Sequence, residues 1–456
     1  MPRVLLLLPT TTYRTHDFME AAQRLGVELT VASEEASTFI RLNPSGLLRL
    51  NFDDPQEAAR QVVQFAGQYP IAAVVPVDDQ VTICGASICQ ALGLRHNSVE
   101  SVTAARNKHR MRERLGHAGV PQPRYQLCSL DDDPVHLADQ VEYPCVVKPL
   151  TLSGSRGVIR ANTAVEFVRA VERLDHILRS EFRQSHSSAL EGSRTRESSD
   201  RSLTTSATTP TRAPFQPTTA RQFLVEDFVA GPEVALEGLL TRGTLRVLTL
   251  FDKPDPLDGP FFEETIYVTP SRLPVAVQAD IARCASHACQ AMGLSEGPVH
   301  AELRINADGP WIIEINPRSI GGLCSRVLRF GTGLALEELI IRHALDGDYA
   351  PPTRENQPAG VMMIPTPRAG VLTEVRGLDE AQTVAGIEQL TISAHLGQEL
   401  IPLPEGALYL GFLFARAATP EAVELALRAS HARLDFLIQP TDAATPQAGT
   451  GSANCS

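Results

Sequence analysis

Residues 298–318 read PVHAELRINADGPWIIEINPR. Apolar and polar side chains alternate on both sides of the pair Asp308-Gly309, which is typical of two antiparallel strands joined by a tight turn. Pairing of Ile305 with Trp311 would set the register of this β-hairpin. The stretch therefore predicts a hairpin with one polar face.

Two carboxylates face each other in that register. Glu302 lies opposite Glu314, and His300 lies opposite Asn316, all on the same face of the hairpin. Because like charges on neighbouring strands repel, a hard divalent cation with oxygen ligands would be an economical way to hold them together. An exposed polar sheet face explains the same pattern, so the hairpin alone leaves both interpretations open.

Upstream, residues 1–100 alternate between short apolar strands and helices. Strands are expected at Arg3–Leu8, Val27–Ala32 and Ile71–Val77. This βαβ alternation predicts a small parallel-sheet α/β domain, and the acidic pair Asp78-Asp79 follows its last strand. No GxGxxG motif follows the first strand, so a dinucleotide role has little support.

A basic helix is expected from Ser101, and a strand that ends in a lysine follows it. The helix carries Arg106, Lys108, Arg110, Arg112 and Arg114, a pattern that a solvated surface also explains. Lys148 ends an apolar strand and precedes the loop Ser153-Gly154-Ser155-Arg156-Gly157. Glycines and short side chains let backbone N–H groups approach phosphate oxygens, and Lys148 adds a positive charge beside them. A plain turn is the alternative.

The segment Val225–Glu233 reads VEDFVAGPE. The end of a strand can offer backbone donors and acceptors to an adenine edge, and an acidic side chain just beyond it can accept ribose hydroxyls. On its own this segment is unremarkable.

Composition and length limit the class of protein. The formal net charge of −12, with 43% hydrophobic and 21% charged residues, argues against nucleic acid or an anionic membrane as the main partner. No stretch reaches the roughly 18 to 20 apolar residues of a membrane helix, so a cytoplasmic protein is expected. The cysteines are expected to be buried and reduced. They are Cys84, Cys89, Cys128, Cys145, Cys284, Cys289, Cys324 and Cys455.

A chain of 456 residues is expected to form two or three domains. Ser and Thr dominate between residues 185 and 220, which predicts a disordered surface insertion between a helix and a strand. Short β segments and one helix, Pro420–Arg433, predict a small α+β C-terminal domain. The expected divisions are 1–100, 101–350, 359–438 and a flexible tail at 441–456.

Taken in order, these segments resemble the ATP-grasp superfamily of carboxylate-amine ligases. The shared elements are a helix lysine, a strand lysine, a small glycine loop, an E-x-x-Φ-x-G-x-E hinge and a final E…E-x-N hairpin. The hinge is similar to that of D-alanine:D-alanine ligases, residues 360–437 resemble the C-terminal domain of bacterial L-amino-acid ligases, and biotin carboxylases share the core. The resemblance implies an α/β fold (α+β ATP-grasp) with a parallel-sheet N-terminal domain, a two-lobed ATP-grasp domain and a small α+β C-terminal domain.

The resemblance also implies roles for the matching residues. Glu302, Glu314 and Asn316 would bind Mg²⁺, with Mn²⁺ as an alternative. Arg318 would hold the substrate carboxylate or the developing phosphate charge, and Arg318 and Lys148 would be catalytic. In ATP binding, Glu226 and Val229 would contact adenine and Glu233 the ribose. The residues implied in ATP binding are Lys108, Lys148, Ser153, Gly154, Ser155, Gly157, Glu226, Phe228, Val229 and Glu233.

Substrate contacts are expected in two further places. Glu263 and Glu264 lie where L-amino-acid ligases bind a substrate amino group, and Lys253 is a candidate phosphate ligand; surface acidity is the alternative. After Arg318, a backbone wall near the acyl group is the hypothesis, although a helix-entry turn explains the same residues. They are Ser319, Gly321 and Gly322.

The resemblance implies a ligase that forms an acyl phosphate from a carboxylate and joins it to an amine, releasing ADP and phosphate. One alternative is an enzyme like biotin carboxylase that activates bicarbonate; since no Met-Lys-Met acceptor sequence occurs, it would need a separate carrier. A nucleotide-binding protein without catalysis is the other. Small carboxylates and amines, amino acids above all, are the expected partners, and a homodimer is left open. The sequence does not identify the acid, the amine or the pathway.

Overall fold

Four parallel strands form the N-terminal sheet of the computed structural model, which describes residues 1–35, 37, 42–197, 221–347 and 349–440. Leu5 and Leu6 are both fully buried although they point to opposite faces, because helices cover the sheet on both sides. The predicted parallel α/β arrangement is confirmed. The strands, in sheet order, are β3 (Leu47–Arg49), β2 (Glu28–Ser33), β1 (Arg3–Leu7) and β4 (Ala73–Pro76).

The two faces of this sheet are covered by helices from different parts of the chain. α2 (Pro55–Ala66) and α3 (Thr82–Leu92) share a core cluster with Leu5. α1 (Thr15–Leu25) shares the other cluster with Leu6, and so does α9 (Leu336–Leu345), which comes from much later in the sequence. Through α9, the N-terminal sheet is packed onto the rest of the molecule.

The basic segment forms two helices, whereas one helix was expected. α4 covers Val99–Ala105 and α5 covers Lys108–His117. The break falls at Asn107, whose side chain accepts a hydrogen bond from the backbone N–H of Arg110 and so caps α5. The backbone N–H of Lys108 also donates to the carbonyl of Leu150, 2.9 Å away, so the start of α5 is tied to the segment that follows the lysine strand.

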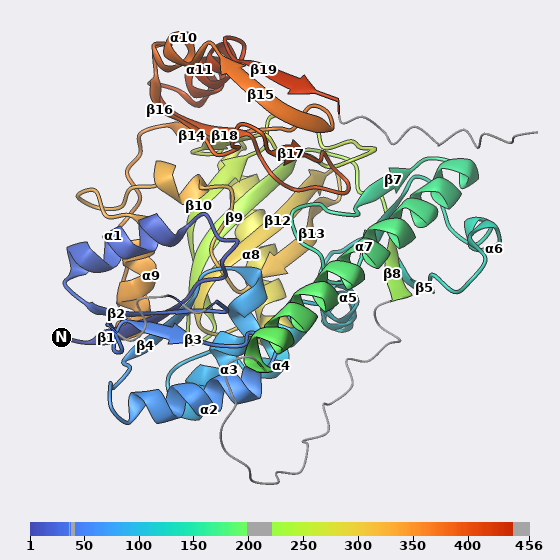
Figure 1. The fold of residues 1–456 in the computed structure, drawn as a ribbon. Helices are drawn as coiled ribbons and strands as arrows, with labels where there is room; N and C mark the ends of the chain where they lie inside the picture. Colours follow the sequence, from blue (N-terminus) through green and yellow to red (C-terminus); the bar gives the residue numbers. More distant parts are fainter. Residues whose placement is uncertain (36, 38–41, 198–220, 348, 441–456) are drawn as a thin grey trace, which may run out of the picture.

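A small antiparallel sheet and two helices form the smaller lobe. The sheet order is β5-β8-β6-β7, with β5 at Tyr125–Ser129, β8 at Gln222–Asp227, β6 at Cys145–Pro149 and β7 at Ile159–Ala161. α6 (Pro134–Ala138) packs against α7 (Ala164–Glu197), the long green helix of Figure 1. The prediction of disorder is wrong for residues 185–197, because each added residue of an established helix gains a hydrogen bond even where the sequence is polar. Residues 198–220 lie outside the described residues.

Eight strands form the central sheet, in the order β13-β12-β9-β10-β11-β14-β18-β16. α8 (Val275–Met292) packs against β10 and β13. Together with the smaller lobe, this arrangement confirms the predicted α/β fold class with two lobes. The strands of the first part are β9 (Glu233–Thr241), β10 (Thr244–Asp252), β11 (Ile266–Thr269), β12 (Gly297–Asn306) and β13 (Gly309–Asn316).

The central sheet continues into the C-terminal part of the chain, where β14 (Ala359–Ile364) pairs with β11. A boundary at residue 359 would pass between these two hydrogen-bonded strands, and the domain limits stay a prediction. Figure 1 shows the orange and red C-terminal segments above the central strands. The other elements are β18 (Gly411–Arg416), β16 (Ile387–Ile392), a three-stranded sheet of β17 (Glu399–Leu400), β15 (Gly370–Arg376) and β19 (Asp435–Gln439), α10 (Leu378–Gln382) and α11 (Pro420–His431).

The β12–β13 hairpin has the predicted pairs at the polar face but a different register near the turn. His300 pairs with Asn316 and Glu302 with Glu314, as expected. A bulge after Glu302 then shifts the register, so that Ile305 pairs with Pro310 and not with Trp311. An extra residue on one strand changes the pairing beyond it and leaves the pairing before it intact.

Among the described residues, no helix combines the length and apolar character that crossing a membrane requires. Seven of the cysteines are buried, unpaired thiols, as predicted; Cys455 lies outside the described residues.

Phe414 tests whether the C-terminal strands are part of the main core. Its ring on β18 is 3% exposed and belongs to the same apolar cluster as Leu6 of β1 and Leu339 of α9. We expect Phe414→Ala to destabilise the whole chain by about 3–5 kcal/mol and to lower one common melting transition in calorimetry. Leu425→Ala, at a residue 68% exposed on α11, should stay within about 0.5 kcal/mol. A separate small transition that alone responds to Phe414→Ala would contradict the shared core.

Candidate active site

A cleft lies between the smaller lobe and the central sheet. Its empty volume, with the open mouth included, is about 720 Å³. Residues from α5, β6, β8, β12 and β13 line it, so segments far apart in the sequence converge there. Of the residues that the sequence singled out, the lining includes Lys108, Lys148, Ser153, Gly154, Ser155, Glu226, Phe228, Val229, Glu233, Glu264, Glu302 and Glu314.

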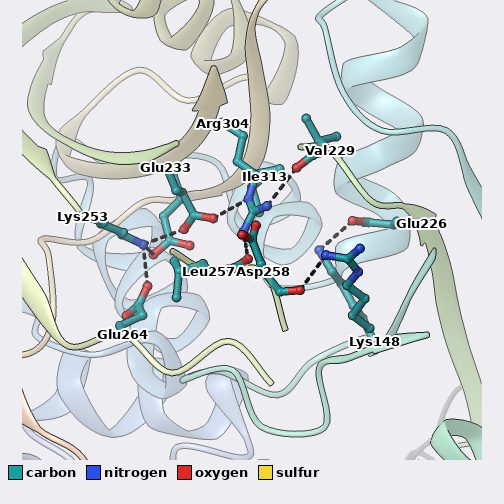
Figure 2. Close-up of polar contacts among 12 residues, drawn as sticks. Lys148, Glu226, Val229, Glu233, Lys253, Leu257, Asp258, Glu264, Arg304 and Ile313 are labelled. Atoms are coloured by element: carbon teal, nitrogen blue, oxygen red, sulfur yellow. Dashed lines mark hydrogen bonds and ion pairs between the residues drawn. The ribbon is translucent and has the colours of Figure 1, made fainter. Parts of the chain in front are cut away.

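Glu226 is held by two cations at one end of the cleft. Lys148 Nζ lies 2.6 Å from Glu226 Oε2, and Arg112 Nε lies 2.7 Å from Oε1. Burial opposes ionisation of Glu226, but Arg112 and Lys148 outweigh it and lower its pKa to about 2. Figure 2 shows the Lys148–Glu226 contact. The carboxylate expected near adenine is therefore a charged anchor between α5, β6 and β8, and its contact with adenine stays a prediction.

Lys253 lies among three carboxylates at the other end. Its Nζ is 2.7 Å from Glu233 and 2.6 Å from Glu264 (Figure 2). It also lies 3.2 Å from Glu302. The side chain is 3% exposed, and the three carboxylates raise its pKa well above the usual value although burial opposes this. Lys253 was expected to bind phosphate, whereas the structure places its ammonium in an acidic environment.

Arg304 is the second cation beside Glu233 and was not among the residues predicted from the sequence. Its Nε donates to Glu233 Oε2 at 2.9 Å, and its other nitrogens donate to the carbonyls of Val229 (2.9 Å) and Leu257 (Figure 2). One guanidinium thus contacts both Glu233, the predicted ribose contact, and Val229, a predicted adenine contact. Arg304 follows Glu302 by two residues, so period-2 alternation, which places both on one face, could have identified it.

The two opposed carboxylates of the hairpin fit a hard divalent cation. Glu302 and Glu314 are direct cross-strand partners, and Lys108 Nζ lies 3.7 Å from Glu314. Glu302 also belongs to a group with Glu233 and Glu264 in which one carboxylate oxygen of each lies within 4.8 Å of the others. All of these donors are oxygens, which is the donor set that Mg²⁺ prefers.

The buried residues His300 and Asn316 lie two positions from these carboxylates along the same strands. The two residues are cross-strand partners, 3% and 4% exposed, and His300 Nε2 is 3.4 Å from Glu302. Burial, Arg318 and Lys253 lower the pKa of His300 to about 3, so its imidazole is neutral and can share only one N–H. Asn316 is not among the described residues that line the cleft.

Arg318 and the residues after it contact the N-terminal part of the chain. Arg318 NH2 lies 3.0 Å from Asp79 Oδ2, and the backbone N–H of Gly322 donates to the hydroxyl of Tyr13 at 2.7 Å. Ser319 Oγ accepts a hydrogen bond from Arg14 at 2.8 Å. None of the four predicted residues Arg318, Ser319, Gly321 and Gly322 is among the described lining residues of the cleft.

The glycine loop is held from above by the C-terminal part. The backbone N–H of Gly157 donates to the carbonyl of Pro404 at 2.9 Å, and Arg156 Nε donates to the carbonyl of Glu405 at 3.1 Å. Gly157 itself is not among the described lining residues. Glu263 is not among them either. Burial raises the pKa of its carboxyl group, and this effect outweighs the backbone hydrogen bond with Thr366, which lowers the pKa.

Arg112 is the functional residue that sequence reasoning missed most clearly. From the sequence, Arg112 belonged to a basic helix face whose charges exposure to solvent could explain, but in the structure it is fully buried. Besides Glu226, it donates to the carbonyls of Ile312 (3.0 Å) and Ile313 (2.7 Å) on β13. One guanidinium therefore ties α5 to both lobes, and the local sequence holds no signal that separates it from the exposed arginines.

Glu226→Gln should change how stability depends on pH. Because the folded pKa of Glu226 is depressed from 4.5 to about 2, its ionisation stabilises the fold fully above about pH 5, and this contribution is lost as the pH falls towards 2. We expect wild type to be more stable than Glu226→Gln by roughly 3 kcal/mol at pH 7, and the difference to shrink below pH 5 in urea unfolding. Glu172→Gln, at an exposed residue of α7, is the matched control. Parallel pH profiles for wild type and Glu226→Gln would contradict the charged anchor.

Three domain families match successive parts of the chain. The ATP-grasp N-terminal domain matches residues 19–96, the ATP-grasp domain matches residues 201–327, and the L-amino acid ligase C-terminal domain 2 matches residues 362–439. These segments contain strands β2, β3 and β4 of the parallel N-terminal sheet, the hinge with the β12–β13 hairpin, and most of the C-terminal strands.

Relatives and solved structures agree with these matches. Protein y4rH of Sinorhizobium fredii is 22% identical over 96% of this chain and 84% of its own length. Alanine–anticapsin ligase of Bacillus subtilis is 21% identical over 63% of this chain, which spans 56% of the length of that ligase. The crystal structure of an L-amino acid ligase from Bacillus licheniformis has a TM-score of 0.72 at 22% identity, covering 96% of this chain and 99% of that one, which establishes the shared fold. The chain therefore carries ATP-grasp domains at residues 19–96 and 201–327 and an L-amino acid ligase C-terminal domain at residues 362–439.

Proposed function

We propose that this chain is an ATP-dependent carbon–nitrogen ligase that forms ADP. It activates the carboxylate of a small molecule, an amino acid, as an acyl phosphate and joins it to an amine in a peptide or amide bond. The domain matches and the names of the relatives, one an alanine–anticapsin ligase, support this proposal. The substrates are assigned here only as a class.

One observation carries the proposal: two lysines and two opposed carboxylates line the same cleft. Lys148 comes from the smaller lobe, Lys108 comes from the start of α5, which packs against α8, and Glu302 and Glu314 come from the central sheet. Lysine ammonium groups bind phosphate oxygens as point charges, and paired carboxylates suit a hard cation. A nucleoside triphosphate with a divalent cation is the ligand class that needs both sets in one cleft.

Residues of the smaller lobe and of α5 bind and orient the nucleotide. Lys108 and Lys148 neutralise phosphate charge, and the backbone of Ser153–Ser155 adds N–H donors to the phosphate oxygens. Phe228 offers an apolar surface near the hinge, with the ring of Phe262 at a centroid distance of 6.5 Å. In this proposal the purine lies beside these rings.

Glu302, Glu314 and Asn316 would hold Mg²⁺ or Mn²⁺, with Glu264 close to Glu302. A divalent cation there supplies positive charge that stabilises the developing negative charge of the transferring phosphoryl group. Lys253, 3.2 Å from Glu302, balances the same acidic group from inside the protein.

Arg318 orients the substrate carboxylate towards the nucleotide, since a planar guanidinium binds carboxylates and phosphates through paired N–H donors. One carboxylate oxygen attacks the γ-phosphorus while the bond from phosphorus to the β-phosphate oxygen breaks, which gives an acyl phosphate and ADP. The neutral amine then attacks the acyl carbon, loses a proton, and phosphate leaves with its bridging oxygen. No nucleophile from the chain is needed.

The glycine loop and the segment above it shield the intermediate from water. Gly157 and Arg156 donate to the carbonyls of Pro404 and Glu405, so the C-terminal part holds the loop over the cleft. Exclusion of water limits hydrolysis of the acyl phosphate before the amine arrives.

Release of ADP tests this function directly. With purified chain, MgATP and an equimolar mixture of the twenty proteinogenic L-amino acids, we expect ADP and phosphate to form many times faster than without amino acids. EDTA in excess over the divalent cation should abolish this release. Equal rates with and without amino acids would contradict the amine-ligase function, and AMP with pyrophosphate would contradict the acyl phosphate. Release that depends on bicarbonate alone would favour the carboxylase-like alternative.

Glu314→Gln tests the proposed cation site. The substitution keeps the shape of the side chain and removes its charge, so we expect ADP release to fall below a tenth of the wild-type rate while the melting temperature changes little. Glu172→Gln, exposed on α7, should keep full activity. Retention of more than a tenth of the activity, a loss below about 1.4 kcal/mol in transition-state stabilisation, would remove Glu314 from the site.

A further inference from the structure

The segment that follows the β12–β13 hairpin is anchored by the N-terminal part of the chain. Each anchor is a side chain at or near the carboxyl end of a strand of the parallel sheet, or at the start of α1. The contacts are Arg318–Asp79 (3.0 Å), Ser319–Arg14 (2.8 Å), Gly322–Tyr13 (2.7 Å) and Arg326–Asp17 (3.1 Å). The expected carboxylate-binding segment is therefore built against a second domain.

Asp79 is presented rigidly. It follows β4 and is the first residue of a short 3₁₀ helix, η1 (Asp79–Val81). The hydroxyl of Thr82 donates to the carbonyl of Asp79 at 2.8 Å, which fixes the backbone of this turn. The side chain of Asp79 is 11% exposed. In open α/β sheets, ligands bind beyond the carboxyl ends of the strands. Asp79 lies at such an end and has no role in the function proposed above.

The charge of Asp79 is maintained by cations from two other elements. Arg318 NH2 lies 3.0 Å from one carboxylate oxygen, and Arg106 NH1 lies 3.9 Å from the other. Burial opposes ionisation of Asp79, but Arg318 and Arg106 outweigh it and lower its pKa. Asp79 therefore faces Arg318 as a carboxylate.

The contacts of Arg318 fix its orientation and leave donors available. A guanidinium has five N–H donors in one plane. One goes to Asp79, and another goes to the carbonyl of Ser319 at 3.0 Å. These two contacts to different nitrogens hold the plane of the guanidinium, and its remaining N–H groups donate to no other described residue.

We propose that Asp79 is a positioning residue, which orients the guanidinium of Arg318 for the substrate carboxylate across the boundary between the two domains. This inference rests on the proposed function. It assigns the N-terminal sheet a part in handling the acid substrate, whereas the nucleotide is bound by the two lobes of the cleft. Loss of the Asp79 charge should therefore impair binding and reaction of the acid substrate and leave binding of ATP unchanged.

Asp79→Asn tests the assignment, since it keeps the shape of the side chain and removes the charge that holds Arg318. With the twenty-amino-acid mixture as the varied probe and saturating MgATP, we expect the half-saturating concentration to rise at least fivefold and kcat to fall at least tenfold. KM for MgATP, measured at saturating mixture, should stay within twofold. A residue that serves only the fold would reduce the amount of active enzyme and leave both saturation constants unchanged.

Asp78→Asn is the matched control, because Asp78 is the neighbouring carboxylate, is partly exposed and forms no ion pair with Arg318. Kinetics of Asp79→Asn equal to those of Asp78→Asn, or a rise in KM for MgATP parallel to that for the mixture, would overturn the positioning role. If Asp79→Asn shows no cooperative melt, Asp79→Glu decides by the same criteria, since its longer side chain displaces the contact while keeping the charge. Absence of amino-acid-dependent ADP release in wild type would instead overturn the proposed function, and the positioning role with it.

Discussion

Carboxylates that lie together in a buried cleft must be balanced by cations, and this requirement organises the candidate site. Glu226 is balanced by Arg112 from α5 and Lys148 from β6, and Glu233 is balanced by Lys253 and Arg304. Removing one partner of a buried pair leaves an unpaired charge, which costs about 3–5 kcal/mol. Arg112 joins the two lobes, because it pairs with Glu226 of the smaller lobe and also donates to the carbonyls of Ile312 and Ile313 on the central sheet.

The parts of the site that follow from local pattern could be predicted from the sequence. Alternation around Asp308-Gly309 is a property of the hairpin itself, so the facing of Glu302 and Glu314 needed no knowledge of the rest of the chain. The bulge after Glu302 could not be predicted in the same way. It leaves the carbonyls of neighbouring Ile312 and Ile313 both directed to Arg112, a residue 200 positions away, and no local pattern encodes that contact.

The same limit explains the residues that were missed. A basic helical segment gives the same pattern whether its arginines face solvent or a carboxylate, and burial of Arg112 depends on where β8 places Glu226. The acidic pair after β4 was noticed, but only packing of the N-terminal sheet against the segment after β13 makes Asp79 a partner of Arg318. Two helix boundaries were mispredicted for a related reason. The break at Asn107 depends on a helix cap, and the extension of α7 to Glu197 depends on a helix that begins at Ala164.

The charge pairs also set a condition on how the cleft takes up its ligands. Under the proposed function, a phosphate chain that engaged Lys148 would compete with Glu226, which would then keep Arg112 alone. A divalent cation at Glu302 would repel the ammonium of Lys253 and leave Glu233 and Glu264 to share it. A nucleotide alone would add negative charge to the acidic end of the cleft, and a cation alone would add positive charge beside Lys253 and Arg304. The two together would bring anion to the lysines and cation to the carboxylates, so the buried charge would stay nearly balanced. The electrostatics of the cleft would thus favour joint binding of the proposed nucleotide and cation over binding of either one alone.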